Sequence, residues 1–361
     1  MRDDAVKCAT LSHKTIAFKT ELGANGAARD EEWLFKRTIK ARKKRYKQVR
    51  LQLKIIVVMV AWICEMPMKA QLNEVPIHYF DLQSVVNPAA VGADKLLHLR
   101  AEGTLSFAGA QRHPRTFYVA TDAPLPLSRQ QHGVGLQWMR HQLDLSTQQQ
   151  VVLQYAYRFP LGKGALAAGA QIGLLTETFD GEKLDPSQPH NPAWPTSKAT
   201  EHAMTMGVGV CYVQPLWFAG FAVHALNAPT LQLTPAYAVT HKPLYSLVGG
   251  YDVRFRNPHL TLKTSALLQA TQKKFRADVT ARMVYQRDKK QVYGGLTYSP
   301  THAVTALVGG TFHGVVLGYH YEYYTSGSNL REGRHGCFVG YQTEFNVGSQ
   351  HRGRHQSIRI L

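Results

Sequence analysis

The stretch KFRADVTARMVYQ, Lys274 to Gln286, alternates apolar and polar residues at nearly every position. Its apolar set is Phe275, Ala277, Val279, Ala281, Met283 and Tyr285, and the polar set between them contains Arg276, Asp278, Thr280 and Arg282. Successive side chains of a β-strand point to opposite faces, so the alternation predicts a strand with one apolar and one charged face. What the apolar face contacts, a second sheet or lipid, decides the fold.

The same alternation recurs along the chain. We expect fourteen strands, at 95–106, 115–123, 132–141, 148–159, 164–179, 201–213, 216–226, 244–256, 260–270, 274–286, 291–299, 303–312, 315–325 and 334–347. None is apolar on both faces over its whole length, as the buried strands of a soluble protein often are. Most are long enough to cross a bilayer at a tilt. A closed barrel with lipid outside and a polar interior accounts for this pattern.

The connections between these strands differ in length according to the end of the barrel at which they lie. The long ones, near 180–200, 227–243 and 326–333, all join an odd strand to the following even strand. The even-to-odd turns are mostly short and rich in Pro, Gly and Asn. Outer-membrane barrels have short periplasmic turns and longer outer loops. We therefore predict an all-β, antiparallel, up-and-down outer-membrane barrel of about 14 strands, with 231–240 as part of an outer loop.

Eleven charged or histidine side chains fall on the polar face of the predicted strands. They are Arg100, Glu102, Arg158, Asp252, Arg254, Arg276, Asp278, Arg282, His320, Glu322 and Glu344. On the lipid side near the midplane, each arginine would cost about 2–4 kcal/mol, so we expect them to point inward. They form either a selectivity lining or ligand site, or a network of ion pairs that fills the lumen. Buried charges need partners, which favours the network.

The N-terminal region has the features of an export signal. Nine Lys and Arg residues lie within 36–50, and the ten apolar residues IIVVMVAWIC follow at 55–64. A basic region, a short apolar core and a small residue at the end are typical of a cleaved secretory signal, here with cleavage after Ala70. The alternative is a cytosolic tail with a membrane anchor. We thus divide the chain into an extension and signal (1–70), a periplasmic N-terminal segment (71–94), the barrel (95–347) and a basic periplasmic tail (348–361).

We find no sequence motif for catalysis or for cofactor binding. G-x-S-x-G, H-E-x-x-H and P-loop motifs are missing. Cys211 and Cys337 have opposite strand parity, which argues against a disulfide, and the Cys/His spacing fits no metal site. The net charge of +18 suggests a protein that binds nucleic acid, but no recognisable nucleic-acid-binding domain lies beside the basic run. We expect no enzyme, no cofactor and no nucleic-acid partner.

Three segments together resemble the PorP/SprF family of type IX secretion system membrane proteins from Bacteroidota. HYFDLQSVVNPAAVGAD resembles the opening motif of the family, LQYAYRFPLGKGALAAGAQIGL its Tyr-Arg, Pro-Leu-Gly hairpin, and LGYHYEYYTSG a late element. The matching positions are Asn87, Pro88, Gly92, Tyr157, Arg158, Pro160, Gly162, Tyr319, Tyr321, Glu322, Thr325, Ser326 and Gly327. Glu322 stands where the family usually has Asp.

This resemblance implies a non-enzymatic barrel in outer-membrane lipid. Proteins like it assist the secretion or surface anchoring of cargo with C-terminal sorting domains, including gliding adhesins, and associate with periplasmic ring components. The alternative from another class is a diffusion channel or small-molecule transporter. Loss of the protein would strand cargo in the periplasm in the first case and change only solute uptake in the second. A third class, a lipid hydrolase, would need a Ser/His pair at one rim, and we find no persuasive pair.

Overall fold

The computed structural model describes residues 75–105, 115–125, 131–184, 192–272, 274–288, 290–300, 303–325 and 333–345. The chain divides into two units, residues 1–66 and 67–361, and every described residue belongs to the second. The predicted cleavage site at Ala70, the motif residues Ser326 and Gly327 and the basic tail lie outside the described residues. Within the described ranges, no helix is long and apolar enough to span a bilayer.

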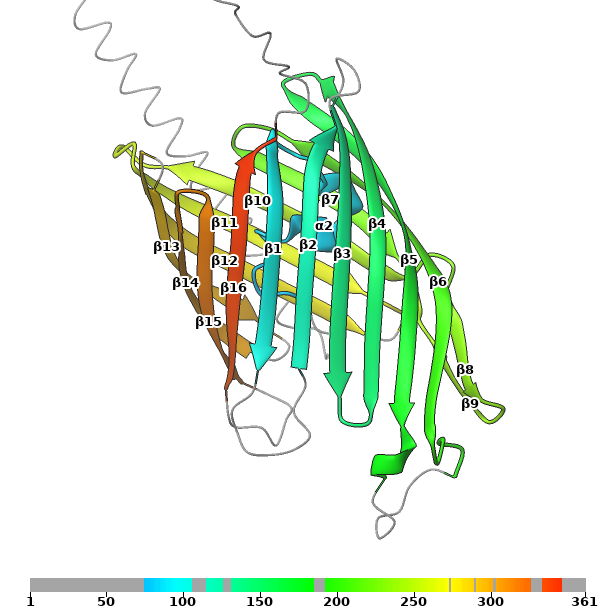
Figure 1. Cartoon of the computed structure of the whole chain (residues 1–361). Coiled ribbons are helices and arrows are strands. Elements are labelled where there is room, and N and C mark those ends of the chain that lie inside the picture. The colour runs from blue at the N-terminus through cyan, green and yellow to red at the C-terminus, as the bar shows by residue number, and fades with distance from the viewer. Residues whose placement is uncertain are drawn as a thin grey trace, which may run out of the picture. The chain divides into compact units, whose positions relative to one another are not determined.

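Fourteen antiparallel strands form one closed barrel, which confirms the predicted fold (Figure 1). They are β1 (Leu96–Leu105), β2 (Arg115–Leu125), β3 (Gln131–Leu143), β4 (Ser146–Leu161), β5 (Gly164–Asp180), β6 (Lys198–Val213), β7 (Trp217–His224), β10 (Leu244–Arg254), β11 (Leu260–Ala270), β12 (Phe275–Arg287), β13 (Lys290–Ser299), β14 (Ala303–Phe312), β15 (Val315–Tyr324) and β16 (Arg334–Glu344). Each pairs with its neighbour in sequence, and β1 pairs with β16 to close the ring. Every predicted strand therefore has a counterpart in the barrel.

The alternation of apolar and polar residues along the strands corresponds to the outer and inner faces of the barrel wall. On β12, Met283 and Tyr285 are exposed outward, whereas Asp278, Thr280 and Arg282 are buried. Large apolar side chains on the other strands are likewise exposed, as in Leu99 on β1 and Leu317 on β15 at 51% and 54%. In water so many exposed apolar side chains would be unfavourable, but they suit a lipid-facing surface.

Loop lengths follow the predicted asymmetry, with one refinement. The turns after β4, β12 and β14 contain only two residues each, whereas 181–197 and 225–243 connect strands at the opposite end. The segment predicted as outer loop, 231–240, contains β8 (Thr230–Thr234) and β9 (Tyr237–Thr240). These two strands pair only with each other, as a separate two-stranded sheet. Their alternation is real, but it does not add strands to the barrel.

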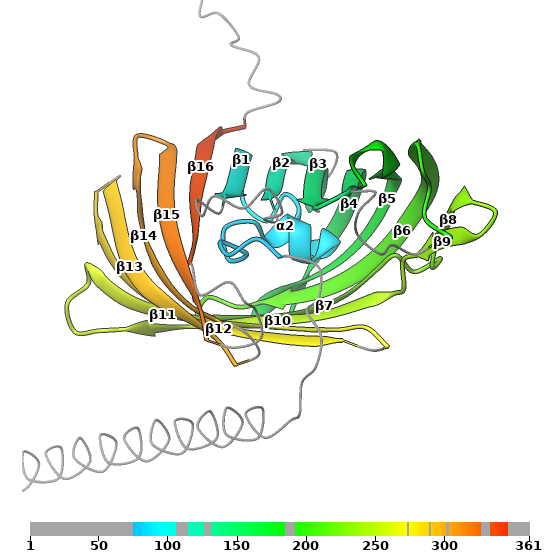
Figure 2. The same cartoon turned by 90° about the horizontal axis from the view of Figure 1, so that it is seen from below.

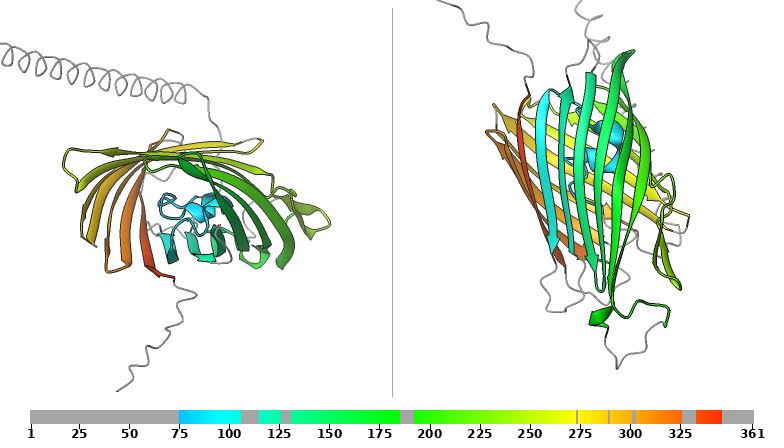
Figure 3. Two further views of the ribbon diagram at one scale, coloured as in Figure 1. Left: turned by 90° about the horizontal axis from the view of Figure 1, so that it is seen from above. Right: turned by 45° about the vertical axis from the view of Figure 1, so that its right-hand side comes forward.

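Residues 75–94, here called the plug, lie inside the ring of strands (Figures 2 and 3). The plug contains α2 (Gln83–Val86) and the 3₁₀-helix η1 (Pro88–Ala90). Its side chains Tyr79, Leu82 and Val91 are at most 1% exposed. The structure thus places 75–94 within the ring of strands, and the assignment of 71–94 to the periplasmic side stays a prediction. So many apolar residues in a short segment need burial, and the barrel interior provides it.

The plug forms a hydrophobic core together with one side of the barrel. The cluster joins plug residues to inward side chains of the five strands β10 to β14: Val75, Tyr79, Phe80, Val86, Val248, Leu267, Val284, Tyr293 and Leu307. Leu82 packs in a second cluster with Tyr118, Ala120 and Phe338. The lumen is thus lined by apolar as well as polar side chains, because its occupant is itself partly apolar.

Candidate functional site

The plug seat, meaning the inward side chains that contact residues 75–94, is the candidate functional site. At its centre, the Asn87 side chain accepts a hydrogen bond from the Ala89 amide at 2.9 Å and thereby caps η1. Its Nδ2 donates to the Val210 carbonyl on β6 at 2.9 Å. A Cβ atom at Gly209 or Gly220 would overlap the Asn87 amide group. The small residues of these strands therefore make room for one specific side chain.

Arg158 on β4 connects two of the segments on which the family resemblance rests. Its guanidinium donates to the Gly92 carbonyl at 2.7 Å and to the Ala89 carbonyl at 3.3 Å. The Gly92 amide donates to Asp122 on β2 at 3.1 Å, and Asp122 pairs with Arg100 at 3.2 Å. Gly92 has φ +59°, which glycine adopts without strain. A buried arginine needs several acceptors, and here the plug backbone supplies them.

Tyr79 fixes the plug to the opposite side of the lumen. Its hydroxyl donates to Thr280 on β12 at 3.0 Å and lies 3.0 Å from the Ser265 hydroxyl on β11. Burial raises the pKa of Tyr79 to about 12, although both hydrogen bonds act in the other direction. The phenol therefore remains protonated at neutral pH and can act as a hydrogen-bond donor to the wall.

An arginine and an aromatic ring form the next contact along the plug. The Arg282 guanidinium lies 3.3 Å from the centroid of the Phe80 ring, and its NH1 lies 3.9 Å from Asp81. A cation over an aromatic face is attracted by the ring quadrupole, and desolvation strengthens the interaction. Arg282 thus holds an apolar and an acidic plug residue at once.

Two histidines and a glutamate meet between the plug and the barrel wall. Glu102 on β1 accepts hydrogen bonds from the backbone amides of Ile77 at 2.7 Å and of His78 at 3.1 Å. The His78 and His320 rings lie 5.1 Å apart between centroids. His78, Glu102 and His320 each offer a donor atom within 4.8 Å of the others, and all three are buried. The sequence pattern predicts no metal site at the histidines, and nothing in it brings His78 together with the other two residues.

Two further ion pairs join residues of the wall without the plug. Arg276 Nε lies 2.7 Å from Asp278 on the same strand, and Asp278 also accepts a hydrogen bond from Ser299. On β15 and β16, Glu322 pairs with Arg334 at 2.7 Å. Asp252, Arg254 and Glu344 lie toward strand ends and are partly or fully exposed. The predicted inward set therefore comprises plug contacts, wall pairs and a more exposed group.

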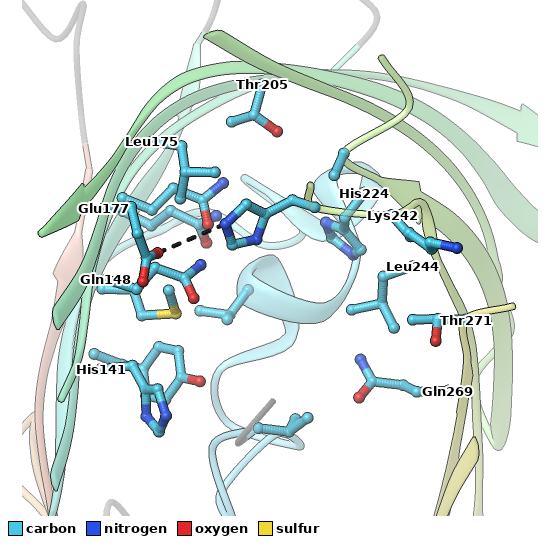
Figure 4. Close-up of a pocket in the computed structure, with 18 of the residues that line it drawn as sticks. His141, Gln148, Leu175, Glu177, Thr205, His224, Lys242, Leu244, Gln269 and Thr271 are labelled. Carbon is cyan, nitrogen blue, oxygen red and sulfur yellow. Dashed lines mark ion pairs between the residues drawn. The ribbon is translucent and has the colours of Figure 1, made fainter. Parts of the chain in front are cut away.

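A cavity of about 510 Å³ remains between the plug and the strands (Figure 4). Plug residues Val75 and Val86 line one side of it. His224 donates from Nε2 to the Val86 carbonyl at 2.8 Å, and its Nδ1 accepts from Gln171. Glu177 and His241 form an ion pair at 3.6 Å across the cavity. The space is bounded mainly by polar side chains of the wall and apolar side chains of the plug.

The other residues of the family resemblance lie on the outside of the wall or in turns. Tyr157 contacts the His132 ring, with centroids 5.2 Å apart, and Tyr321 contacts the His335 ring at 4.8 Å. Pro160 is the last residue but one of β4, Gly162 has φ +59° in the turn that follows, and Thr325 comes directly after β15. Tyr319 is exposed on the outer surface. These positions serve the barrel wall and its hairpins rather than the plug seat.

Sequence reasoning missed most of the plug side of this interface. His78, Tyr79, Phe80 and Asp81 belong to the quoted opening motif, but their contacts were not inferred because the segment lacks strand alternation. Asp122 and Arg334, the partners of two predicted inward residues, were also missed. The available signal was the density of aromatic residues just before Asn87, which is unusual for a solvated segment.

A closed barrel with an apolar outer surface and a plug held in a polar lumen defines the class of outer-membrane β-barrel proteins. The family model described as "Type IX secretion system membrane protein PorP/SprF" matches residues 70–341. The chain therefore belongs to the PorP/SprF family, and it is a type IX secretion outer-membrane component.

Comparison with solved structures finds other barrels at low identity. The Pseudomonas putida toluene transporter TodX is 10% identical, with 72% of this chain and 93% of that chain covered and a TM-score of 0.43. The CymD monoaromatic hydrocarbon channel is 11% identical, with 73% and 93% covered and a TM-score of 0.45. The Acinetobacter baumannii outer membrane protein Omp33 is 6% identical, with 70% and 100% covered and a TM-score of 0.41. No curated protein matches the sequence.

Proposed function

We propose that this protein is a non-enzymatic barrel that assists the secretion or cell-surface anchoring of cargo bearing C-terminal sorting domains, such as gliding adhesins. In this role it is linked to periplasmic ring components of the type IX system. Its family membership over residues 70–341 is the observation that carries the proposal. The chain acts by binding other proteins, and no catalytic step is required of it.

The occupied lumen supports this role over that of a diffusion channel. The plug contacts inward residues on both sides of the ring, through Arg158 on β4 and through Thr280 and Arg282 on β12. Such an interior is filled in part by the protein's own chain, although a cavity of about 510 Å³ remains beside the plug. It instead gives a rigid body whose loops and ends can bind partners, which is what an anchoring component needs.

Export and membrane insertion follow from the same proposal. We propose that the signal is cleaved after Ala70, so that the mature protein begins at Gln71 and the plug enters the barrel from a free N-terminal end. Outer-membrane lipid contacts the exposed apolar side chains of the wall, such as Leu99 and Leu317. N-terminal sequencing of the protein from outer membranes tests the site, and a start upstream of Ile55 would contradict it.

A deletion strain separates the secretion role from the channel role. Surface and periplasmic levels of proteins with C-terminal sorting domains are measured, together with uptake of small solutes. We expect cargo to accumulate in the periplasm and solute uptake to remain unchanged. Normal cargo at the surface with reduced uptake would refute the secretion role and support the channel.

Affinity purification then tests the partner assignment. The barrel is solubilised in mild detergent with a tag on the C-terminal tail or in the 185–191 loop, and bound proteins are identified by mass spectrometry. We expect ring components and sorting-domain cargo to co-purify with either tag. An unrelated outer-membrane barrel of the same strain, tagged in the same way, serves as the control. Recovery of the same proteins with that control would contradict the linkage.

A further inference from the structure

We propose that His78, Glu102 and His320 bind a divalent transition metal of the Zn²⁺ class and that this metal clasps the plug to the barrel wall. The three residues come from three separate elements: the plug, β1 and β15. Nothing in the role proposed above requires a metal, so the two proposals stand or fall separately.

The histidine nitrogens are the first reason for a metal. His78 and His320 are 0% exposed, and both ring nitrogens of each lack a hydrogen-bond partner. Buried polar atoms are nearly always paired, and an imidazole is usually held by a hydrogen bond on at least one nitrogen. Four nitrogens without a hydrogen bond on two neighbouring rings are therefore unusual, and only His78 Nδ1 has a charged group nearby, Glu102 at 3.5 Å. A metal ion would be bound by one nitrogen of each ring, and these two nitrogens would then have a partner.

The geometry is the second reason. His78 Nδ1 lies 3.5 Å from Glu102 Oε2, and the donor atoms of all three residues lie within 4.8 Å of one another. A tetrahedral Zn²⁺ with bonds of about 2.1 Å holds its ligand atoms roughly 3.4 Å apart. The His78–Glu102 pair is already at this spacing, and the other distances, which are at most 4.8 Å, need to shorten by at most about 1.4 Å.

The surroundings constrain the ligands in the way that a metal site requires. The Glu102 carboxylate is held by the Ile77 and His78 amides, so it is oriented before any ion arrives. A Cβ atom at Gly336 would overlap the His320 ring, and one at Gly318 would lie 2.8 Å from His78 Nε2. Glycine at both positions therefore leaves room for the two rings side by side.

The ligand set identifies the class of metal. Two imidazoles and one carboxylate suit Zn²⁺ and neighbouring transition ions, whereas Ca²⁺ and Mg²⁺ prefer oxygen ligands. Three protein ligands leave a fourth position for water. We therefore take Zn²⁺ as the probe, with Mg²⁺ as the ion that should not bind here.

The place of the site in the fold gives the metal a structural role. β16 lies between β1 and β15, and β1 and β16 are the first and last strands of the barrel. A metal on Glu102 and His320 would therefore connect β1 to β15 across β16, and so span the closing seam of the barrel, and His78 would tie the plug to the same point. Binding that requires a folded site stabilises the fold, so metal occupancy would stabilise barrel closure and plug retention together.

The test uses the full chain purified from outer membranes in detergent without a histidine tag. After treatment with EDTA and incubation with Zn²⁺ or Mg²⁺, bound metal is measured by mass spectrometry and the melting temperature by intrinsic fluorescence. We expect about one Zn²⁺ per chain, no Mg²⁺, and a melting temperature that rises with Zn²⁺ and falls again with EDTA.

Matched variants locate the bound metal. His78→Gln, Glu102→Gln and His320→Gln should each abolish binding of Zn²⁺. Two controls should retain it: His224→Gln, which removes another buried plug contact, and His241→Gln, which removes a second, partly buried pair of histidine and carboxylate. Loss of zinc in the controls, or its retention in the three ligand variants, would overturn the assignment.

X-ray absorption at the zinc edge decides the case in which a ligand variant does not fold. In the wild-type protein, we expect the zinc ion to be coordinated by two imidazole nitrogens and one or two oxygens. A shell with a different number of imidazoles, or a folded wild-type protein that binds no zinc, would overturn the proposal.

Discussion

Arg158 shows at the residue scale how the lumen tolerates charge. The side chain is 7% exposed and has no carboxylate among its hydrogen-bond acceptors, yet two plug carbonyls accept from it. Hydrogen bonds to a charged group contribute about 1.5–3 kcal/mol each, which offsets part of the cost of burial. The charge is therefore a fixed part of the plug seat, and it depends on the plug backbone being in place.

The Arg158→Met variant tests this dependence. We expect a barrel that still assembles but melts several degrees lower and whose residues 75–94 are cleaved more readily by protease, because the Ala89 and Gly92 carbonyls lose a donor. Arg140→Met on the neighbouring strand β3 is the control, since Arg140 is exposed. Equal protease sensitivity in the two variants would contradict the assigned role of Arg158.

Val279 and Thr280 on β12 test the two faces of the wall. From the strand alone, arginine should be harmful at outward Val279, at about 2–4 kcal/mol, and better tolerated at inward Thr280. The structure alters the second expectation, because Thr280 is fully buried and accepts a hydrogen bond from Tyr79 of the plug.

We therefore expect two different defects from these substitutions. Val279→Arg should reduce barrel assembly, scored by heat-modifiable mobility on gels. Thr280→Arg should give a folded barrel whose plug is displaced and open to protease. Loss of assembly in both variants to the same extent would contradict this division.

At the scale of elements, strands could be predicted from sequence and the plug could not. Strand positions follow from a period of two, and each of the fourteen expected strands is present because lipid and lumen impose opposite demands on alternate residues. The plug has no such period, since it consists of short helices and turns surrounded on all sides. Its location depends on contacts such as Arg158 to Gly92, which join residues far apart in the chain.

The sequence therefore predicted the wall residues of the candidate site but not their contacts with the plug. Parity placed Glu102, Arg276, Asp278 and Glu322 inward, and the structure buries all four. Parity gives no information about partners, so it did not reveal that Glu102 holds the plug backbone or that Glu322 pairs with Arg334. It also does not separate a short hairpin from a barrel strand, as β8 and β9 illustrate.

A cysteine substitution tests the position of η1 directly. Ala89 on η1 forms a buried cluster with Ala167 on β5 and the free Cys211 on β6. We expect Ala89→Cys to form a disulfide with Cys211 in the mature protein, detected by mass spectrometry of non-reduced peptides. Ala90→Cys, one residue further along, should not cross-link, and a disulfide at that position instead would contradict the placement of the plug.

At the scale of the whole molecule, the barrel is a body with two different ends. Strand β16 ends where β1 begins, since Leu96 pairs with Glu344, and the two-residue turns after β4, β12 and β14 lie at this end. The long connections and the β8–β9 sheet belong to the other end. The proposed link between a periplasmic ring and surface cargo would use this kind of polarity, and we expect the two ends to bind different partners.

Removal of residues 349–361 tests the periplasmic link. This basic segment, with Arg352, Arg354, His355 and Arg359, lies outside the described residues. We expect the truncated barrel to assemble, because the strands end at Glu344, but to retain less of the ring on purification and to export less cargo. Wild-type cargo at the cell surface from a well-folded truncated barrel would exclude a role for the tail.

The plug precedes β1 in the chain, yet it lies within a ring that is closed by β1 pairing with β16. Because β16 is the last strand, this pairing joins the two most distant parts of the barrel sequence and has the highest loop-closure cost. Packing the plug beforehand lowers that cost, since Tyr79 and Phe80 bind strands β11 and β12 while Ala89 and Gly92 bind β4. We therefore expect the plug to favour closure of the barrel, so that deletion of residues 75–94 should slow or prevent the pairing of β1 with β16.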